Sequence, residues 1–231
     1  MTPKDRLIVA LDRSSAREIE SLAAALRDEA GAFKIGLQAF VANGPELVRR
    51  LTTEGFRIFL DLKFHDIPNT ARYAVAEAAG LGASMLTLHA AGGIEMMRAC
   101  ADAAASTPRP PLLLGVTALT SLDQEDLRRT GNPLSVQDYV RRLARAAREA
   151  GLGGVVASPQ EIELIRSECG PEFSIVTPGI RSSADAAGDQ KRTLSAADAI
   201  RAGADWIVVG RPVTASPDPT EAARRIIREI S

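Results

Sequence analysis

The feature that most constrains this fold is an eightfold alternation of short apolar runs with segments that carry helix signals. Most runs are continuously apolar and rich in β-branched residues, as expected of parallel strands that are buried on both faces. The predicted strands cover residues 7–11, 33–35, 57–60, 85–88, 112–116, 154–157, 174–176 and 206–209.

The intervening segments have the start and stop signals of helices. Ser15 and Glu18 predict a capping box, and Gly31 is expected to close that helix; Ser158 and Gly170 bound another. The remaining helices are predicted at residues 45–54, 68–80, 94–105, 136–150, 195–202 and 219–229, with a short extra helix around residues 123–129.

Eight strands that alternate with eight helices in 231 residues predict a (β/α)8 TIM barrel of the α/β class. A single domain is expected to span residues 1–231. An open, doubly wound sheet is the alternative, but no G-x-G-x-x-G turn follows the first predicted strand. The alternation therefore favours the closed barrel.

Charge and cysteine usage exclude several classes of partner. The formal net charge is −1 and the sequence pI is about 6.2, so the chain lacks the basic field of a general nucleic-acid binder. The apolar run at residues 7–11 is too short for a signal peptide or a membrane span. The two cysteines, Cys100 and Cys169, form no short-range pairing motif. We expect a cytoplasmic protein with no nucleic-acid or membrane partner.

Polar and charged residues recur at the carboxyl ends of the predicted strands, where barrel enzymes hold their active sites. They include Asp12, Lys34, Asp61, Lys63, His89, Thr120, Pro178, Arg181, Gly210 and Arg211. This convergence predicts a functional site at one mouth of the barrel.

Asp61 and Lys63 are two positions apart, so on a strand they face the same side, about 6.6 Å apart along the backbone. Ionisable groups that point into a barrel are costly unless they are paired. For an isolated D-x-K, a structural ion pair explains the pattern equally well. Lys34, Asp12 and Asp66 add charges of alternating sign, and this favours a network that holds a cation where it acts.

The carboxylates around Lys63 favour its ammonium form. A lysine that forms a Schiff base needs the neutral amine, so the pattern favours Lys63 as a proton donor or as a stabiliser of negative charge. For His65 we favour a structural role, as a packed loop histidine, over a catalytic role. His89 is similar, but its position at a strand end gives more support to a side chain that faces the site. Because the chain has only two histidines, a His-based metal site is not expected.

A phosphate site is predicted after the last strands. Gly210 lets backbone N–H groups approach an anion, and Arg211 adds a planar bidentate donor. The long segment at residues 177–193 carries Arg181 and Gln190 and is predicted to be a phosphate-binding lid loop. A solvated basic loop is the alternative for this segment.

Several of these segments resemble the signatures of the orotidine 5'-phosphate decarboxylase family. They are residues 11–12 (LD), 33–36 (FKIG), 61–70 (DLKFHDIPNT), 177–181 (TPGIR), 188–192 (GDQKR) and 209–212 (VGRP). The matches run in the family's order from residue 7 to residue 219. Sister sugar-phosphate enzymes share the D-x-K-x-x-D core, whereas DIPNT and GDQKR are much more specific.

The resemblance implies cofactor-free loss of CO2 from orotidine 5'-phosphate, giving UMP in de novo pyrimidine synthesis. Lys63 would protonate ring carbon 6, and Asp61 and Asp66 would hold Lys63. A homodimer is implied, in which Asp66, Ile67 and Thr70 reach the neighbouring subunit's site.

The other implied substrate contacts come from the remaining strand ends and from the long loop. Lys34 and Asp12 would complete the charges and bind ribose hydroxyls, and Thr120 would contact the pyrimidine. The phosphate would be held by Arg181, Gln190, Gly210 and Arg211, with Pro178 in the same substrate-binding set.

The sequence leaves two rival functions open. A magnesium-dependent keto-sugar-phosphate decarboxylase or aldolase-like sister enzyme shares the core motif, but Lys34 stands where those relatives carry a metal-binding carboxylate. A nucleotide-binding barrel without turnover should show a broken network, yet all five charges are present. The decarboxylase is therefore favoured, with no metal and no cofactor.

Overall fold

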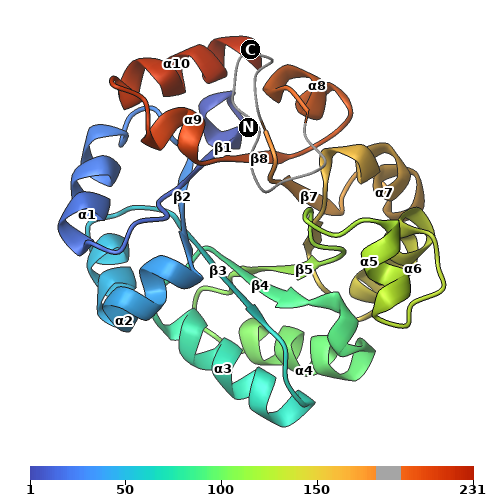
Figure 1. The fold of residues 1–231 in the computed structure, drawn as a ribbon. Helices are drawn as coiled ribbons and strands as arrows, with labels where there is room; N and C mark the ends of the chain where they lie inside the picture. Colours follow the sequence, from blue (N-terminus) through green and yellow to red (C-terminus); the bar gives the residue numbers. More distant parts are fainter. Residues whose placement is uncertain (181–193) are drawn as a thin grey trace.

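The computed structural model describes residues 1–180 and 194–231, and these contain a closed barrel of eight parallel strands in sequence order. In Figure 1 the strands surround the centre of the molecule and the helices lie outside them. The strands are β1 (Leu7–Ala10), β2 (Ala32–Gly36), β3 (Ile58–Phe64), β4 (Met85–His89), β5 (Leu112–Val116), β6 (Gly154–Val156), β7 (Ser174–Thr177) and β8 (Trp206–Val209). The predicted barrel is confirmed, and the open sheet is not formed.

The helices follow the predicted segments closely. They are α1 (Ala16–Ala25), α2 (Leu37–Thr53), α3 (Pro68–Gly80), α4 (Ile94–Ala105), α5 (Gln124–Arg129), α6 (Val136–Glu149), α7 (Ile162–Cys169), α8 (Ala196–Arg201), α9 (Arg211–Thr214) and α10 (Pro219–Glu229). Short 3-10 turns occupy Lys4–Arg6, Ala90–Gly92 and Pro159–Glu161. No helix in the two described ranges is both long and apolar enough to cross a membrane.

Apart from α7, which begins at Ile162 after a 3-10 turn, and the short α9, which was not predicted, two helices differ from the sequence prediction. The helix capped by Ser15 ends at Ala25, so Gly31 does not close it. Gly31 instead lies against the backbone of Asp5, whose carbonyl oxygen would be 2.5 Å from any Cβ at that position. A side chain is therefore excluded there by close backbone approach.

The second difference is in α2, where the sequence predicted only the part after Asn43. Gly44 breaks the helical path with φ +67°, and Pro45 begins the second half. The first half was missed because two of its apolar residues, Leu37 and Val41, are exposed and give no core-facing periodicity.

The core has two layers, because side chains alternate between the inside of the barrel and the space under the helices. The interior is filled by Ile8, Ala10, Ala32, Phe59, Met85, Leu114, Val176 and Val208. A larger apolar layer lies between the barrel and its helices. Polar side chains that continue the inward rows toward the carboxyl ends therefore meet above an apolar floor.

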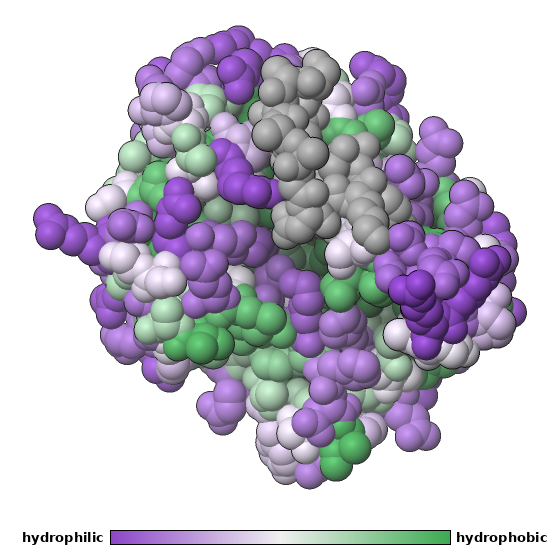
Figure 2. Space-filling view, in the orientation of Figure 1, coloured by the Kyte–Doolittle hydropathy of each residue, from purple (hydrophilic) through white to green (hydrophobic). Residues whose placement is uncertain are grey.

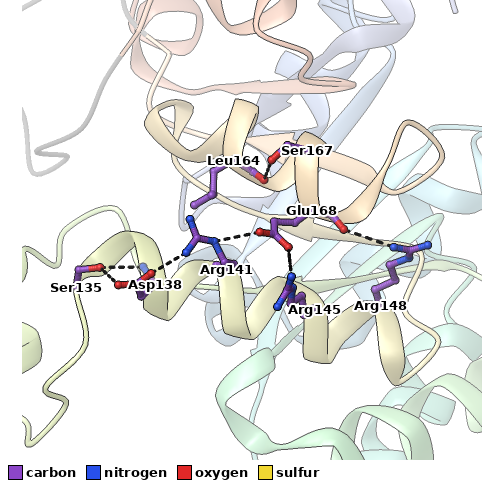
Figure 3. Close-up of polar contacts among 8 residues, drawn as sticks. All are labelled: Ser135, Asp138, Arg141, Arg145, Arg148, Leu164, Ser167 and Glu168. Carbon is purple, nitrogen blue, oxygen red and sulfur yellow. Dashed lines mark hydrogen bonds and ion pairs between the residues drawn. The ribbon is translucent and has the colours of Figure 1, made fainter.

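Ion pairs fasten α6 to α7 on the outside of the barrel (Figure 3). Glu168 lies between Arg141 and Arg145, with N···O distances of 3.2 Å and 2.6 Å. Both arginines are more than one-third exposed, so each pair contributes at most about 1 kcal/mol. Apolar burial, rather than this cluster, fixes the helix positions.

Arg166 contributes more to stability than this cluster, at the amino-terminal end of the barrel, where β7 and β8 begin. Its guanidinium donates to the carbonyls of Phe173 (2.8 Å) and Gly203 (2.7 Å) and to the Asp205 carboxylate (2.9 Å). Asp205 also accepts from the backbone N–H of Ile175 at 2.8 Å. One half-buried ion pair therefore ties together the turns that precede both strands.

Candidate active site

A cavity of about 510 Å³ opens at the carboxyl ends of the strands. In Figure 2 the centre of this face is hollowed, and hydrophilic side chains border the hollow. The predicted site residues that line the cavity are Asp12, Lys34, Asp61, Lys63, Thr120, Pro178, Gly210 and Arg211. The structure therefore brings these eight predicted residues together at one mouth of the barrel.

Two lysines and two carboxylates from three strand ends form the charge array, by which we mean Asp12, Lys34, Asp61 and Lys63. Lys63 Nζ lies 2.8 Å from Asp61 Oδ2, and Lys34 Nζ lies 3.8 Å from the same oxygen. Lys34 also pairs with Asp12 Oδ1 at 2.9 Å. The Asp61 side chain is only 11% exposed, so this carboxylate is largely desolvated and held between two ammonium groups.

The strands aim these groups inward through their register. Lys34 pairs with Ala10 of β1, and Gly36 pairs with Asp61 of β3. The next inward position after Lys34 is thus a glycine, and a Cβ there would lie 2.7 Å from Lys34 Nζ. Gly36 leaves room for the lysine ammonium beside Asp12.

Lys63 departs from the regular strand that the sequence predicted. Its φ is +53°, the one left-handed non-glycine residue in the described ranges, and the β3–β4 register shifts between Leu60 and Phe64. A bulky residue in this region is strained by about 1–3 kcal/mol. The Lys63 N–H donates to Thr87 Oγ1 at 2.9 Å, which holds the conformation.

Asp66, Ile67 and Thr70 do not join the cavity of their own chain. All three are exposed at the β3–α3 connection, and Asp66 Oδ1 accepts from the N–H of Ile67 at 2.7 Å. Within the described residues no ion pair joins Asp66 to Lys63. Within one chain the structure therefore brings together four of the five predicted charges, because β3 ends at Phe64, before Asp66.

The two histidines lie together beside the site. Their ring centroids are 5.2 Å apart, with His89 half-buried and His65 exposed. Burial lowers the pKa of His89, and the nearby His65 and Lys63 lower it further. His89 is thus held neutral near pH 7. Among residues 1–180 and 194–231, no cluster of three or more His, Cys, Asp or Glu side chains is arranged to hold a metal ion.

The predicted phosphate site is described only in part. Gly210 and Arg211 line the cavity, where Gly210 is the N-cap and Arg211 the first residue of the short helix α9. Arg181 and Gln190, with most of the predicted lid loop, lie outside the described residues.

Three residues that the sequence reasoning missed also belong to this region. Arg13 and Gln38 line the cavity, and Thr87 lies beneath Asp61. The sequence contains a signal by which Thr87 could have been found. It is the one hydroxyl residue in the apolar run at residues 85–88, and strand alternation turns it inward with Met85.

The fold and site define a (β/α)8-barrel enzyme whose charged site lies at the carboxyl ends of its strands. Residues 5–226 match the model of the Orotidine 5'-phosphate decarboxylase / HUMPS family. The chain belongs to this family.

Individual relatives are similar to this chain over nearly its whole length. An orotidine 5'-phosphate decarboxylase of Moorella thermoacetica is 51% identical, covering 100% of this chain and 94% of the relative. One from Syntrophotalea carbinolica is 49% identical, covering 99% and 96%. The crystal structure of orotidine 5'-phosphate decarboxylase from Lactobacillus acidophilus matches with a TM-score of 0.87 and 35% identity, covering 97% of this chain and 98% of that one.

Proposed function

We propose that this chain catalyses the decarboxylation of orotidine 5'-phosphate to UMP and CO2, the last step of de novo pyrimidine nucleotide synthesis. The observation that carries the proposal is the Lys63 ammonium, held 2.8 Å from Asp61 in a cavity that also contains Lys34. Family membership, with close relatives of that name, supports it.

The chemistry requires stabilisation of a carbanion. When the bond between ring carbon 6 and the carboxylate breaks, CO2 leaves and the electron pair stays on carbon 6. Lys63 then gives a proton to that carbon, so its ammonium stabilises the developing charge and completes the reaction. No cofactor is required as an electron sink in this scheme. Asp61 holds the ammonium and faces the departing carboxylate.

The rest of the cavity binds the other parts of the substrate. Asp12 and Lys34 bind ribose hydroxyls, Thr120 contacts the pyrimidine, and Pro178 belongs to the same substrate-binding set. The phosphate is bound by Gly210 and Arg211 together with Arg181 and Gln190 of the lid loop at residues 177–193. Remote phosphate binding of this kind can close a loop and assemble the site.

The functional unit in this proposal is a homodimer. Asp66 is a charged member of the core motif that does not reach its own Lys63, and Ile67 beside it is 68% exposed. Leu37 and Val41 are also exposed, and Figure 2 shows hydrophobic side chains gathered near α2 on this face. A second copy that covers this surface would bring its Asp66, Ile67 and Thr70 to the site.

The direct test is to incubate the purified protein with orotidine 5'-phosphate and follow the change in pyrimidine absorbance. Turnover to UMP is expected, and Lys63→Ala should lose it while still binding UMP. Binding of UMP without turnover by the wild-type protein would instead establish the nucleotide-binding barrel. Near wild-type activity of Lys63→Ala would remove Lys63 as the proton donor.

The magnesium-dependent rival is separated by chelation. EDTA should leave turnover of orotidine 5'-phosphate unchanged, because Lys34 occupies the position where a metal-binding carboxylate would be needed. A reproducible magnesium requirement, with turnover of a keto-sugar phosphate, would favour the rival enzyme.

Subunit mixing tests whether Asp66 acts across the interface. Lys63→Ala and Asp66→Asn should each be inactive alone, but a mixed dimer regains one site with both native residues. An equal mixture should therefore recover about one quarter of wild-type activity under random association. No recovery in a mixture that sedimentation shows to contain dimers would place Asp66 in its own subunit's site.

The two buried cysteines and the pathway suit a cytoplasmic enzyme that works without nucleic acid or membrane. Cell fractionation should recover the activity with the cytosol, and recovery in the membrane pellet would contradict this.

A further inference from the structure

Thr87 lies below the cavity and outside the set of residues that line it. It is the middle residue of β4 and is fully buried, above Met85 in the barrel interior. A hydroxyl placed there must find partners within the protein, because water does not reach it.

Its partners are the two residues at the centre of the proposed chemistry. Thr87 Oγ1 donates to Asp61 Oδ1 at 2.9 Å and accepts from the backbone N–H of Lys63 at 2.9 Å. One hydroxyl thus joins the side chain of the carboxylate to the main chain of the lysine.

These two hydrogen bonds have different consequences. The bond to Asp61 Oδ1 fixes the rotation of the carboxylate, so that Oδ2 points to the ammonium groups of Lys63 and Lys34. The bond from Lys63 N–H stabilises the left-handed backbone from which that side chain reaches back to Asp61. Removal of the hydroxyl would free both groups at once and leave buried polar atoms unpaired.

We propose that Thr87 is a positioning residue that sets the distance and orientation of the Lys63–Asp61 pair for proton transfer. The inference rests on the proposed decarboxylase function for the reaction that it serves. Because Thr87 does not line the cavity, it acts on the chemical step through its neighbours and leaves substrate binding nearly unchanged.

The test compares Thr87→Val, which removes the hydroxyl and keeps the shape, with Thr87→Ser, which keeps the hydroxyl. Loss of a hydrogen bond to a charged group predicts a kcat about 10- to 100-fold lower in Thr87→Val, with KM within about threefold. Thr87→Ser should stay within about threefold of wild type. If the valine variant does not fold, Thr87→Ala removes the hydroxyl without adding a methyl group.

Thr52→Val is the matched control. The Thr52 hydroxyl donates to the Leu81 carbonyl at a distance of 2.9 Å, and Thr52 does not line the cavity. It should lower the melting temperature without lowering kcat. An unchanged kcat in Thr87→Val, or a serine variant as slow as the valine variant, would overturn the proposal.

A crystal structure of Thr87→Val provides a readout that does not depend on activity. We expect the Asp61 carboxylate to be rotated or the Lys63–Asp61 separation to exceed 2.8 Å. Unchanged geometry would refute the positioning role even if the wild-type protein showed no turnover, whereas an inactive wild type with altered variant geometry would refute only the proposed function.

Discussion

Gly36→Ala should disable the site while leaving the fold intact. A Cβ at this position would lie 2.7 Å from Lys34 Nζ and 3.1 Å from Asp12 Oδ1, with no other described atom beyond its chain neighbours within 4 Å. The backbone of Gly36 has φ −95° and ψ −175°, an extended conformation that alanine adopts without strain. The new methyl group therefore meets only the ion pair.

The size of the effect follows from how far the ammonium must move. A normal contact of about 3.5 Å requires Lys34 Nζ to shift by roughly 0.8 Å. The weakened attraction to Asp12 amounts to about 1 kcal/mol at an effective dielectric constant near 20, and to less because Asp12 is half exposed. This term alone lowers the rate by at most about fivefold. Misplacement of a group in an active site by close to 1 Å can cost about 100-fold, so we expect kcat/KM to fall about 10- to 100-fold.

Steady-state decarboxylation and chemical denaturation measure the two sides of this prediction. The free energy of unfolding should change by less than about 1 kcal/mol, since alanine also restricts the unfolded chain. Gly80→Ala is the matched control, because nothing lies within 4 Å of a Cβ there and the site is distant. Wild-type kcat/KM in folded Gly36→Ala would refute the reasoning that the ammonium position is set by the space at residue 36.

Three further predictions concern stability, pH and thiol reactivity. Arg166→Met should lower the free energy of unfolding by about 2–4 kcal/mol, because it leaves Asp205 half-buried without its cation, and a loss below about 0.5 kcal/mol in urea denaturation would contradict this. Because the pKa of His89 is lowered in the native protein, only the unfolded chain takes up its proton just below pH 6.5, so stability falls as pH falls. The melting temperature of His89→Gln should therefore drop less than that of wild type between pH 7.5 and 5.5. An equal drop would exclude His89 as the source of the pH dependence. Burial raises the pKa of Cys100 to about 11 and also raises that of Cys169, so neither thiol should react with Ellman's reagent at pH 8 until the protein unfolds.

Much of the fold could be predicted because the buried parallel strands and the capped helices are encoded locally. The ranges predicted for α3, α4 and α10 agree with the structure, since each has clear boundary residues and an apolar stripe. Most of the charge array was also predictable, because strand alternation turns Lys34 and Asp61 inward and because Asp12 and Lys63 lie close to the carboxyl ends of their strands.

The rest depends on geometry that no local pattern contains. The left-handed Lys63 arises from a register shift between two strands, and the link from Thr87 to Asp61 joins positions 26 residues apart. Asp66 shares a short motif with Lys63 but turns away from it. Its predicted role requires a second chain, which a pattern along one sequence cannot place.

The left-handed backbone at Lys63 has a consequence for how such a protein can gain thermal stability or lose its activity. Glycine or asparagine fits this conformation with less strain than lysine, so replacing Lys63 would relieve local strain in the folded state. With Lys63 as the proposed proton donor, selection for thermal tolerance or expression level alone would thus favour variants that have lost turnover. A library screened for this protein should keep a requirement for growth without supplied pyrimidine at every round, so that gains in melting temperature are not obtained by discarding the lysine.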